Sequence, residues 1–188
     1  FGLVNDHTNK EGFVVSSDSD WAGLYSTTGE TRSRSGSCIT LDGMPIAWGS
    51  QHQKCVGTSY KEGLDEAEVA QSSAEGELYA AADTLKLALH MSYVADELNI
   101  PMPSPLIMLV DATAAIGKIQ GPRGGGKLKH IDLRQDWIKL LKNRKIVEVV
   151  KVPGEANPAD CFTKILGRVA FNKSESELMG RIDGDGRK

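Results

Sequence analysis

The 188-residue chain lacks the features of a membrane-spanning protein and of a protein built on zinc-thiolate or disulfide bonds. No stretch approaches the roughly 20 apolar residues that a membrane-spanning helix needs, so we expect no membrane partner. The three cysteines, Cys38, Cys55 and Cys161, are an odd number and form no CxxC pair, which argues against a zinc site and a disulfide framework. We expect them to be small buried side chains in a reducing compartment.

An excess of positive charge is also missing. The 22 Lys and Arg residues are outnumbered by 25 Asp and Glu residues, which gives a formal net charge of −3. Domains that bind nucleic acids by themselves commonly carry a basic face, so a nucleic-acid substrate would require a local basic patch or a tethered partner.

Size and hydrophobic content fit one α/β domain. Domains typically contain about 100 to 200 residues, and a hydrophobic content of 40% is enough for one core, in which we expect Trp21, Trp48 and Trp137. The chain begins without an initiator Met and without the basic start of a secretory signal. We therefore interpret it as a piece of something longer.

The first third of the chain has the pattern of three consecutive antiparallel strands. Residues 13–18 and 35–41 are β-rich runs, and the second run leads into residues 42–43, an Asp-Gly pair that favours a hairpin turn. The returning strand then occupies residues 45–56. We interpret the polar and acidic segment 58–69 as a solvated loop or a short helical insertion.

Helical periodicity dominates the rest of the chain. Apolar residues recur at three- and four-residue steps from Leu78 to Leu98, which predicts a long helix that Pro101 and Pro103 stop. The continuous apolar run 106–110 is typical of a central strand covered on both faces. Four further elements are expected: a short helix over 112–119, a helix over 131–141, a strand over 146–152, and a helix with Asn157 at its N-cap and Pro158 at N1.

Four acidic residues stand where this pattern would bring metal ligands together. Asp18 ends the first apolar run, Glu77 lies in the long helix, Asp111 ends the central strand, and Asp160 opens the late helix. The hard cation Mg²⁺ prefers such carboxylate oxygens and keeps several waters. Two ions about 3.5 to 4 Å apart can activate a water and stabilise the leaving oxygen of a phosphodiester. The acids therefore predict a two-metal nuclease site without an organic cofactor.

Two of these acids have a rival of the same chemistry nearby. Asp20 would face the same side as Asp18 if the strand continued, although it could instead bond the turn that follows. Glu75 and Glu77 point about 200° apart on a helix, so only one of them can face the site.

The other two acids also have simpler interpretations. Asp111 could merely cap the short helix that follows it, although α/β sheets place their ligands at the carboxyl ends of buried strands. Asp160, near the start of its helix, would interact favourably with the helix dipole whether or not a metal is nearby.

Two basic groups could contact phosphates, although either could be a solvated surface. We give His130 a structural or phosphate-binding role rather than one in proton transfer. The first group, on a hairpin edge, is Arg32 and Arg34. The second group, at a helix start, is Lys127, Lys129, His130 and Arg134.

The order of elements, with an acid at each of these four places, resembles the ribonuclease H fold. Several sequence blocks resemble one branch of it, the RNase H domain of copia-type long-terminal-repeat retrotransposon polyproteins. The blocks occur in the family's order and span most of residues 13–166. They are 17–23 (SDSDWAG), 34–36 (RSG), 46–50 (IAWGS), 72–80 (SSAEGELYA), 129–134 (KHIDLR) and 157–164 (NPADCFTK).

The resemblance implies an RNase H-like α/β fold. Its five-stranded mixed sheet has three antiparallel strands followed by two parallel ones, flanked by helices. This domain would occupy residues 12–167, between an N-terminal connection segment (1–11) and a partly disordered C-terminal helix and tail (168–188).

The resemblance also implies an endoribonuclease that cuts the RNA strand of RNA/DNA hybrids with two Mg²⁺ or Mn²⁺ ions. Asp18 would bridge both metals, Glu77 rather than Glu75 and Asp111 would complete the site, and Asp160 would support the metal that activates the water. The implied partner is the reverse transcriptase domain of the same polyprotein, within a cell, in the cytoplasm or in virus-like particles.

The chain departs from the family at three places. The segment 57–71 is longer than usual, residues 124–126 are three glycines, and the loop 153–156 (PGEA) has no counterpart of the mobile His that follows the last strand in cellular RNases H. Two other functions stay open: an inactive RNase H-like module that tethers parts of a polymerase, and a DNA nuclease of the same fold.

Overall fold

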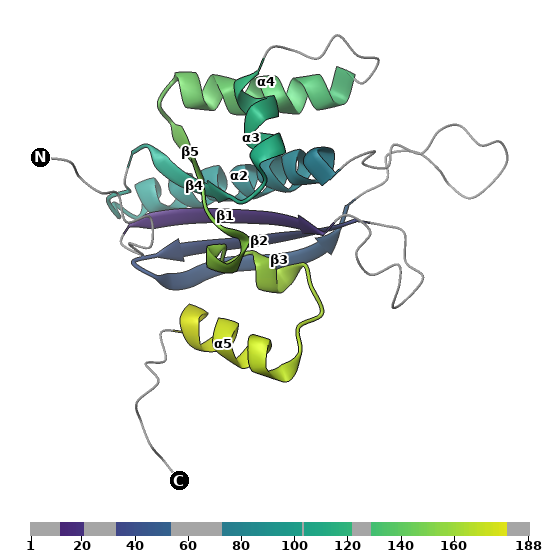
Figure 1. The fold of residues 1–188 in the computed structure, drawn as a ribbon. Coiled ribbons are helices and arrows are strands. Elements are labelled where there is room, and N and C mark those ends of the chain that lie inside the picture. Colours follow the sequence, from purple (N-terminus) through teal and green to yellow (C-terminus); the bar gives the residue numbers. More distant parts are fainter. Residues whose placement is uncertain (1–11, 21–32, 54–72, 103, 122–128, 180–188) are drawn as a thin grey trace, which may run out of the picture.

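Five strands form one mixed sheet in the computed structural model of the chain (Figure 1). The structure describes residues 12–20, 33–53, 73–102, 104–121 and 129–179. In the order β3-β2-β1-β4-β5, the first three strands pair antiparallel and the last two join in parallel, as predicted. The strands are β1 (Phe13–Asp20), β2 (Arg34–Leu41), β3 (Met44–His52), β4 (Leu106–Val110) and β5 (Val147–Lys151).

The predicted hairpin turn between β2 and β3 is confirmed. Asp42 and Gly43 have φ values of 49° and 79°, the left-handed conformation that a two-residue hairpin turn of this kind needs. The Asp42 carboxylate also accepts a hydrogen bond from the Gly12 N–H at 2.8 Å. The turn is thereby tied to the start of β1.

One face of the sheet is covered by helices that contribute residues to the core. In Figure 1, α2, α3 and α4 lie on one face and α5 lies beyond the other. Among the described residues, no helix is long and apolar enough to cross a membrane. The helices and 3-10 turns are α2 (Ser73–Glu97), α3 (Thr113–Gln120), α4 (Lys129–Asn143), η1 (Gly154–Ala156), η2 (Asp160–Phe162) and α5 (Arg168–Leu178).

The hydrophobic core lies between the sheet and the helices on this face, of which the longest is α2. This helix is rich in Ala and Leu, which have high helix propensity. Its buried alanines are small, so α2 can lie close to β1 and β2, while Leu78 and Leu85 fill the space against Ile39 and Met108 of the sheet. The same packing carries the first turns of α2 to the end of β1.

Trp48 is not in the core, contrary to expectation. Side chains alternate between the two faces of a strand, and Ala47 takes the side of β3 that packs against the core. Trp48 therefore points to the opposite face, where it is 61% exposed. Trp137 does pack against the core, and Trp21 lies outside the described residues.

The helix expected to begin at Asn157 is instead a short 3-10 turn. The turn η2 has three residues, and α5 begins only at Arg168. Asp160 therefore opens a turn, so the interaction with a helix dipole that was considered for it does not apply. A contact distant in sequence explains the difference, because the Asn157 side chain donates a hydrogen bond to the Ser17 carbonyl of β1.

Candidate metal centre

Asp18 and Asp111 come together because their strands are parallel neighbours. Ser16 of β1 lies opposite Leu109 of β4, and continuing this register by two residues brings Asp18 opposite Asp111. Asp18 is only 3% exposed, and Asp111 is half-buried. The next helix, α3, has Ala112 at its N-cap and no side-chain cap. The structure therefore does not use Asp111 as the cap of α3.

Glu77 reaches the same edge from the first turns of α2. It is 6% exposed, and its Oε1 accepts a hydrogen bond from the Ser19 N–H at 3.3 Å. A Cβ on Gly76 would lie only 2.7 Å from Ser19 Oγ, so the absence of a side chain lets α2 approach β1 here. The rival acid, Glu75, forms an ion pair with Lys118 of α3 at 3.5 Å.

Two buried polar side chains fix the segment around Asp160 to β1. Asn157 Nδ2 donates to the Ser17 carbonyl at 2.9 Å, and its Oδ1 accepts the backbone N–H two residues later at 3.1 Å. The Thr163 hydroxyl donates to Asp18 Oδ2. The sequence indicated Asn157 only as a cap and gave no local signal for Thr163, since both partners lie about 140 residues away.

Gly36 makes room for this segment on the neighbouring strand. It pairs with Asp18 across β1 and β2. A Cβ at this position would lie 2.6 Å from the Ala159 carbonyl oxygen and 2.8 Å from Thr163 Cγ2. The glycine therefore permits the close packing that holds η2 beside Asp18.

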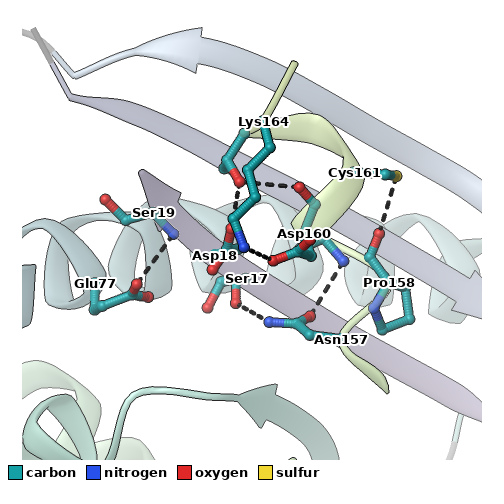
Figure 2. A network of polar contacts seen from close by, with 11 residues as sticks. Ser17, Asp18, Ser19, Glu77, Asn157, Pro158, Asp160, Cys161 and Lys164 are labelled. Atoms are coloured by element: carbon teal, nitrogen blue, oxygen red, sulfur yellow. Dashed lines mark hydrogen bonds and ion pairs between the residues drawn. The ribbon is translucent and has the colours of Figure 1, made fainter. Parts of the chain in front are cut away.

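Three of the four predicted carboxylates converge. Asp18, Glu77 and Asp111 each offer one oxygen, and these oxygens lie within 4.8 Å of one another. Asp160 is not in this group. Its carboxylate accepts a hydrogen bond from Lys164 Nζ beside Asp18 (Figure 2). Its charge still acts on Asp18 and Asp111, so Asp160 borders the cluster.

Burial makes the negative charge of this cluster costly. It raises the pKa of Glu77 to about 9, and the charges of Asp18 and Asp111 contribute in the same direction. Burial likewise raises the pKa of Asp18, although the Thr163 hydroxyl opposes this, and it raises the pKa of Asp111. A bound cation would favour the ionised form of each of these acids.

Unpartnered oxygens show that the cluster fits a divalent cation. Glu77 Oε2 and Asp111 Oδ1 are buried and have no hydrogen-bond partner among the described residues. A buried polar atom without a partner costs free energy. Carboxylate oxygens are the ligands that Mg²⁺ takes in proteins, so the donor set matches such an ion.

Two of the predicted basic residues, Arg34 and Arg134, contact other residues of their own chain. On the hairpin edge, Arg34 donates to Ser50 Oγ at 3.2 Å and lies 3.2 Å from His52 Nε2. The Arg134 guanidinium lies 4.1 Å from the centroid of the Tyr79 ring, which links α4 to α2. Lys129 and His130 begin α4, whereas Arg32 and Lys127 lie outside the described residues.

Comparison with known proteins shows that the chain is similar to a part of retrotransposon Pol polyproteins. No protein-family model matches it. It is 29% identical to the retrovirus-related Pol polyprotein from transposon TNT 1-94 of Nicotiana tabacum over 163 residues. This aligned region is 87% of this chain and 11% of the relative. The corresponding polyprotein from transposon RE2 of Arabidopsis thaliana is 30% identical over 162 residues, 86% of this chain and 10% of the relative. The chain thus spans about a tenth of the length of these curated relatives.

Two solved structures show the same fold. LC11-RNase H1, isolated from compost by a metagenomic approach, matches with a TM-score of 0.51 and 17% identity over 88% of this chain and 99% of that one. The N-terminal RNase H domain of Rv2228c from Mycobacterium tuberculosis matches with a TM-score of 0.50 and 12% identity, over 87% and 96% of the two chains. The resemblance found in the sequence is thereby confirmed: over most of its length the chain is homologous to copia-type retrotransposon Pol polyproteins, and its fold is that of the ribonucleases H.

Proposed function

We propose that the chain is an endoribonuclease that hydrolyses the RNA strand of RNA/DNA hybrids. The observation that carries this proposal is the convergence of Asp18, Glu77 and Asp111 within 4.8 Å, at the end of two parallel strands of an RNase H-like sheet. Burying three acids together is unfavourable unless they are neutralised. Such an arrangement is expected of a metal site and is not needed by a module that only spaces other domains.

In this proposal, two Mg²⁺ or Mn²⁺ ions are held by Asp18, Glu77, Asp111 and Asp160. When bound, the ions supply a nucleophilic water at neutral pH and stabilise the leaving oxygen of the phosphodiester. The protein holds Asp18 rigidly through its strand and through Thr163. Asp160 lies at the margin of the three acids and forms an ion pair with Lys164. Its carboxylate can bind a metal ion in place of the Lys164 ammonium group.

The substrate is proposed from the shape that such a site can recognise. An A-like duplex hides its base edges in a deep groove, so recognition rests on the backbone and on 2′-hydroxyl groups. Phosphate contacts would come from Arg34, Arg134, Lys129 and His130, with Arg32 and Lys127 beyond the described residues.

The net charge of −3 favours a tethered partner, because electrostatic affinity for a nucleic acid is then weak. The relatives are named as Pol polyproteins, and we propose that the reverse transcriptase domain of the same polyprotein supplies the affinity. The domain would then act where the element is copied, in the cytoplasm or in virus-like particles.

The test is cleavage of matched RNA/DNA, RNA/RNA and DNA/DNA duplexes in the presence and absence of Mg²⁺. The native chain should cut only the RNA of the hybrid, and only with the metal, while Asp111→Asn should lose the activity. Asp83→Asn is the matched control, because Asp83 pairs with Lys86 on the exposed face of α2. Cleavage of DNA duplex alone would show a DNA nuclease, and equal activity in Asp111→Asn would contradict the site.

A further inference from the structure

Gln53 occupies the place where the ends of β1 and β3 meet the start of α2. Its backbone N–H donates to the Ser33 carbonyl at 2.8 Å, which continues the pairing of β2 and β3 by one residue. The backbone is therefore fixed while the side chain points across the ends of the neighbouring strands. Gln53 was not among the residues that the sequence indicated for the site.

The side-chain amide of Gln53 joins three segments of the chain. Its Nε2 lies 3.0 Å from Ser19 Oγ on β1, 3.0 Å from Ser35 Oγ on β2 and 2.9 Å from the Gly76 carbonyl of α2. The Gly76 carbonyl can only accept a hydrogen bond, so the nitrogen of the amide, rather than its oxygen, must face it. Gln53 Oε1 is buried without a partner among the described residues, so its nitrogen makes the contacts that orient the side chain.

Two of the partners of Gln53 are directly connected to Glu77. Gly76 precedes Glu77 in α2, and the Ser19 N–H donates to Glu77 Oε1. Glu77 is also the one acid of the converging three that a helix carries, so its distance from Asp18 depends on how α2 sits on the sheet. The helix α2 lies close to β1 at this point, because a Cβ on Gly76 would lie only 2.7 Å from Ser19 Oγ.

We propose that Gln53 is a positioning residue for Glu77. By holding the Gly76 carbonyl and the Ser19 hydroxyl at once, its amide fixes the first turn of α2 against the end of β1. The Glu77 carboxylate is thereby kept within reach of Asp18. This inference rests on the metal site of the proposed function, and it gives Gln53 no contact with substrate or metal.

The test is a double-mutant cycle on metal affinity, with Mn²⁺ alone as the probe in isothermal titration calorimetry. Gln53→Met keeps the length of the side chain and removes its hydrogen bonds. We expect it to weaken Mn²⁺ binding about tenfold, the lower end of what losing a partner of a metal ligand costs. In the Glu77→Gln background the same change should have no further effect, because Gln53 acts through Glu77. Gln51→Met, at an exposed position of β3, is the control and should bind as the native chain does.

Equal weakening in both backgrounds, or no weakening at all, would overturn the role of Gln53. Gln53→Ala is measured in the same way, and thermal unfolding of every variant separates a loss of folding from a loss of affinity. The hydrolysis assay distinguishes this inference from the proposed function. Coupling between Gln53 and Glu77 without hybrid cleavage would contradict only the function, and cleavage without coupling would contradict only the inference.

Discussion

At the scale of single residues, the site is a set of acids whose surroundings disfavour their charges. Glu77 is the extreme case, since its pKa of about 9 leaves it mostly protonated near neutral pH when no cation is bound. The pKa values of its neighbours Asp18 and Asp111 are raised as well. The metal-free protein therefore holds a proton on Glu77, where the proposed enzyme holds a metal ion.

A pH dependence of stability follows from Glu77. Its pKa is raised from 4.5 to about 9 on folding, so between these values the native state binds more protons than the unfolded state. The free energy of unfolding of the metal-free protein should then fall as pH rises through this window. Urea denaturation from about pH 5 to about pH 8.5 measures it. Glu77→Gln should flatten the slope, and an unchanged slope in this variant would exclude Glu77 as its source.

Lys164 is a cation whose charge acts on all three of these acids. It binds Asp160 and lowers the pKa values of Asp18, Glu77 and Asp111 through its charge. Its side chain is half exposed, so it can move away when another cation arrives.

Replacing Lys164 should therefore separate two effects. Lys164→Gln is expected to lower the melting temperature of the metal-free protein, because it removes a neutralising charge. The same change should tighten Mn²⁺ binding severalfold, because it removes a competing cation. Lys86→Gln, which breaks an exposed ion pair elsewhere on α2, is the control for both measurements. Weaker Mn²⁺ binding in Lys164→Gln would show instead that Lys164 supports the metal.

At the scale of elements, the segment around η2 is held by contacts with a distant strand. The local sequence predicted a helix from Asn157, and this prediction was wrong because the Asn157 amide and the Thr163 hydroxyl bind a strand about 140 residues away. A capping pattern describes only neighbours in sequence. The strands and α2 were predictable because their signals, alternation, periodicity and the turn at Asp42-Gly43, are local.

Gly36→Ala tests the packing of η2 on β2. The new Cβ would lie within 3 Å of both the Ala159 carbonyl and Thr163 Cγ2, so the turn must move away from the sheet. Overpacking of this kind costs about 1 to 3 kcal/mol, which urea denaturation would show, and Mn²⁺ binding should weaken as Asp160 moves. Gly117→Ala in α3 is the matched control, since its Cβ meets nothing within 4 Å and it should be neutral or slightly stabilising. A Gly36→Ala variant as stable as the native chain would contradict this account of the packing.

At the scale of the whole molecule, the sequence predicted the fold more fully than the site. The mixed sheet of three antiparallel strands followed by two parallel ones, and the positions of Asp18, Glu77 and Asp111 in their elements, followed from patterning and family resemblance. Gln53 could not be predicted, because its partners come from β1, β2 and α2 and become neighbours only in the folded chain. Trp48 was misplaced because alternation along β3 does not reveal which face the core covers.

The most direct measurement is anomalous diffraction from crystals soaked in Mn²⁺. We expect strong anomalous peaks among the carboxylates of Asp18, Glu77 and Asp111, with Asp160 at their margin and released from Lys164. Mn²⁺ found only at other positions, in crystals where this cluster is accessible and intact, would contradict the claim that these acids form a metal centre.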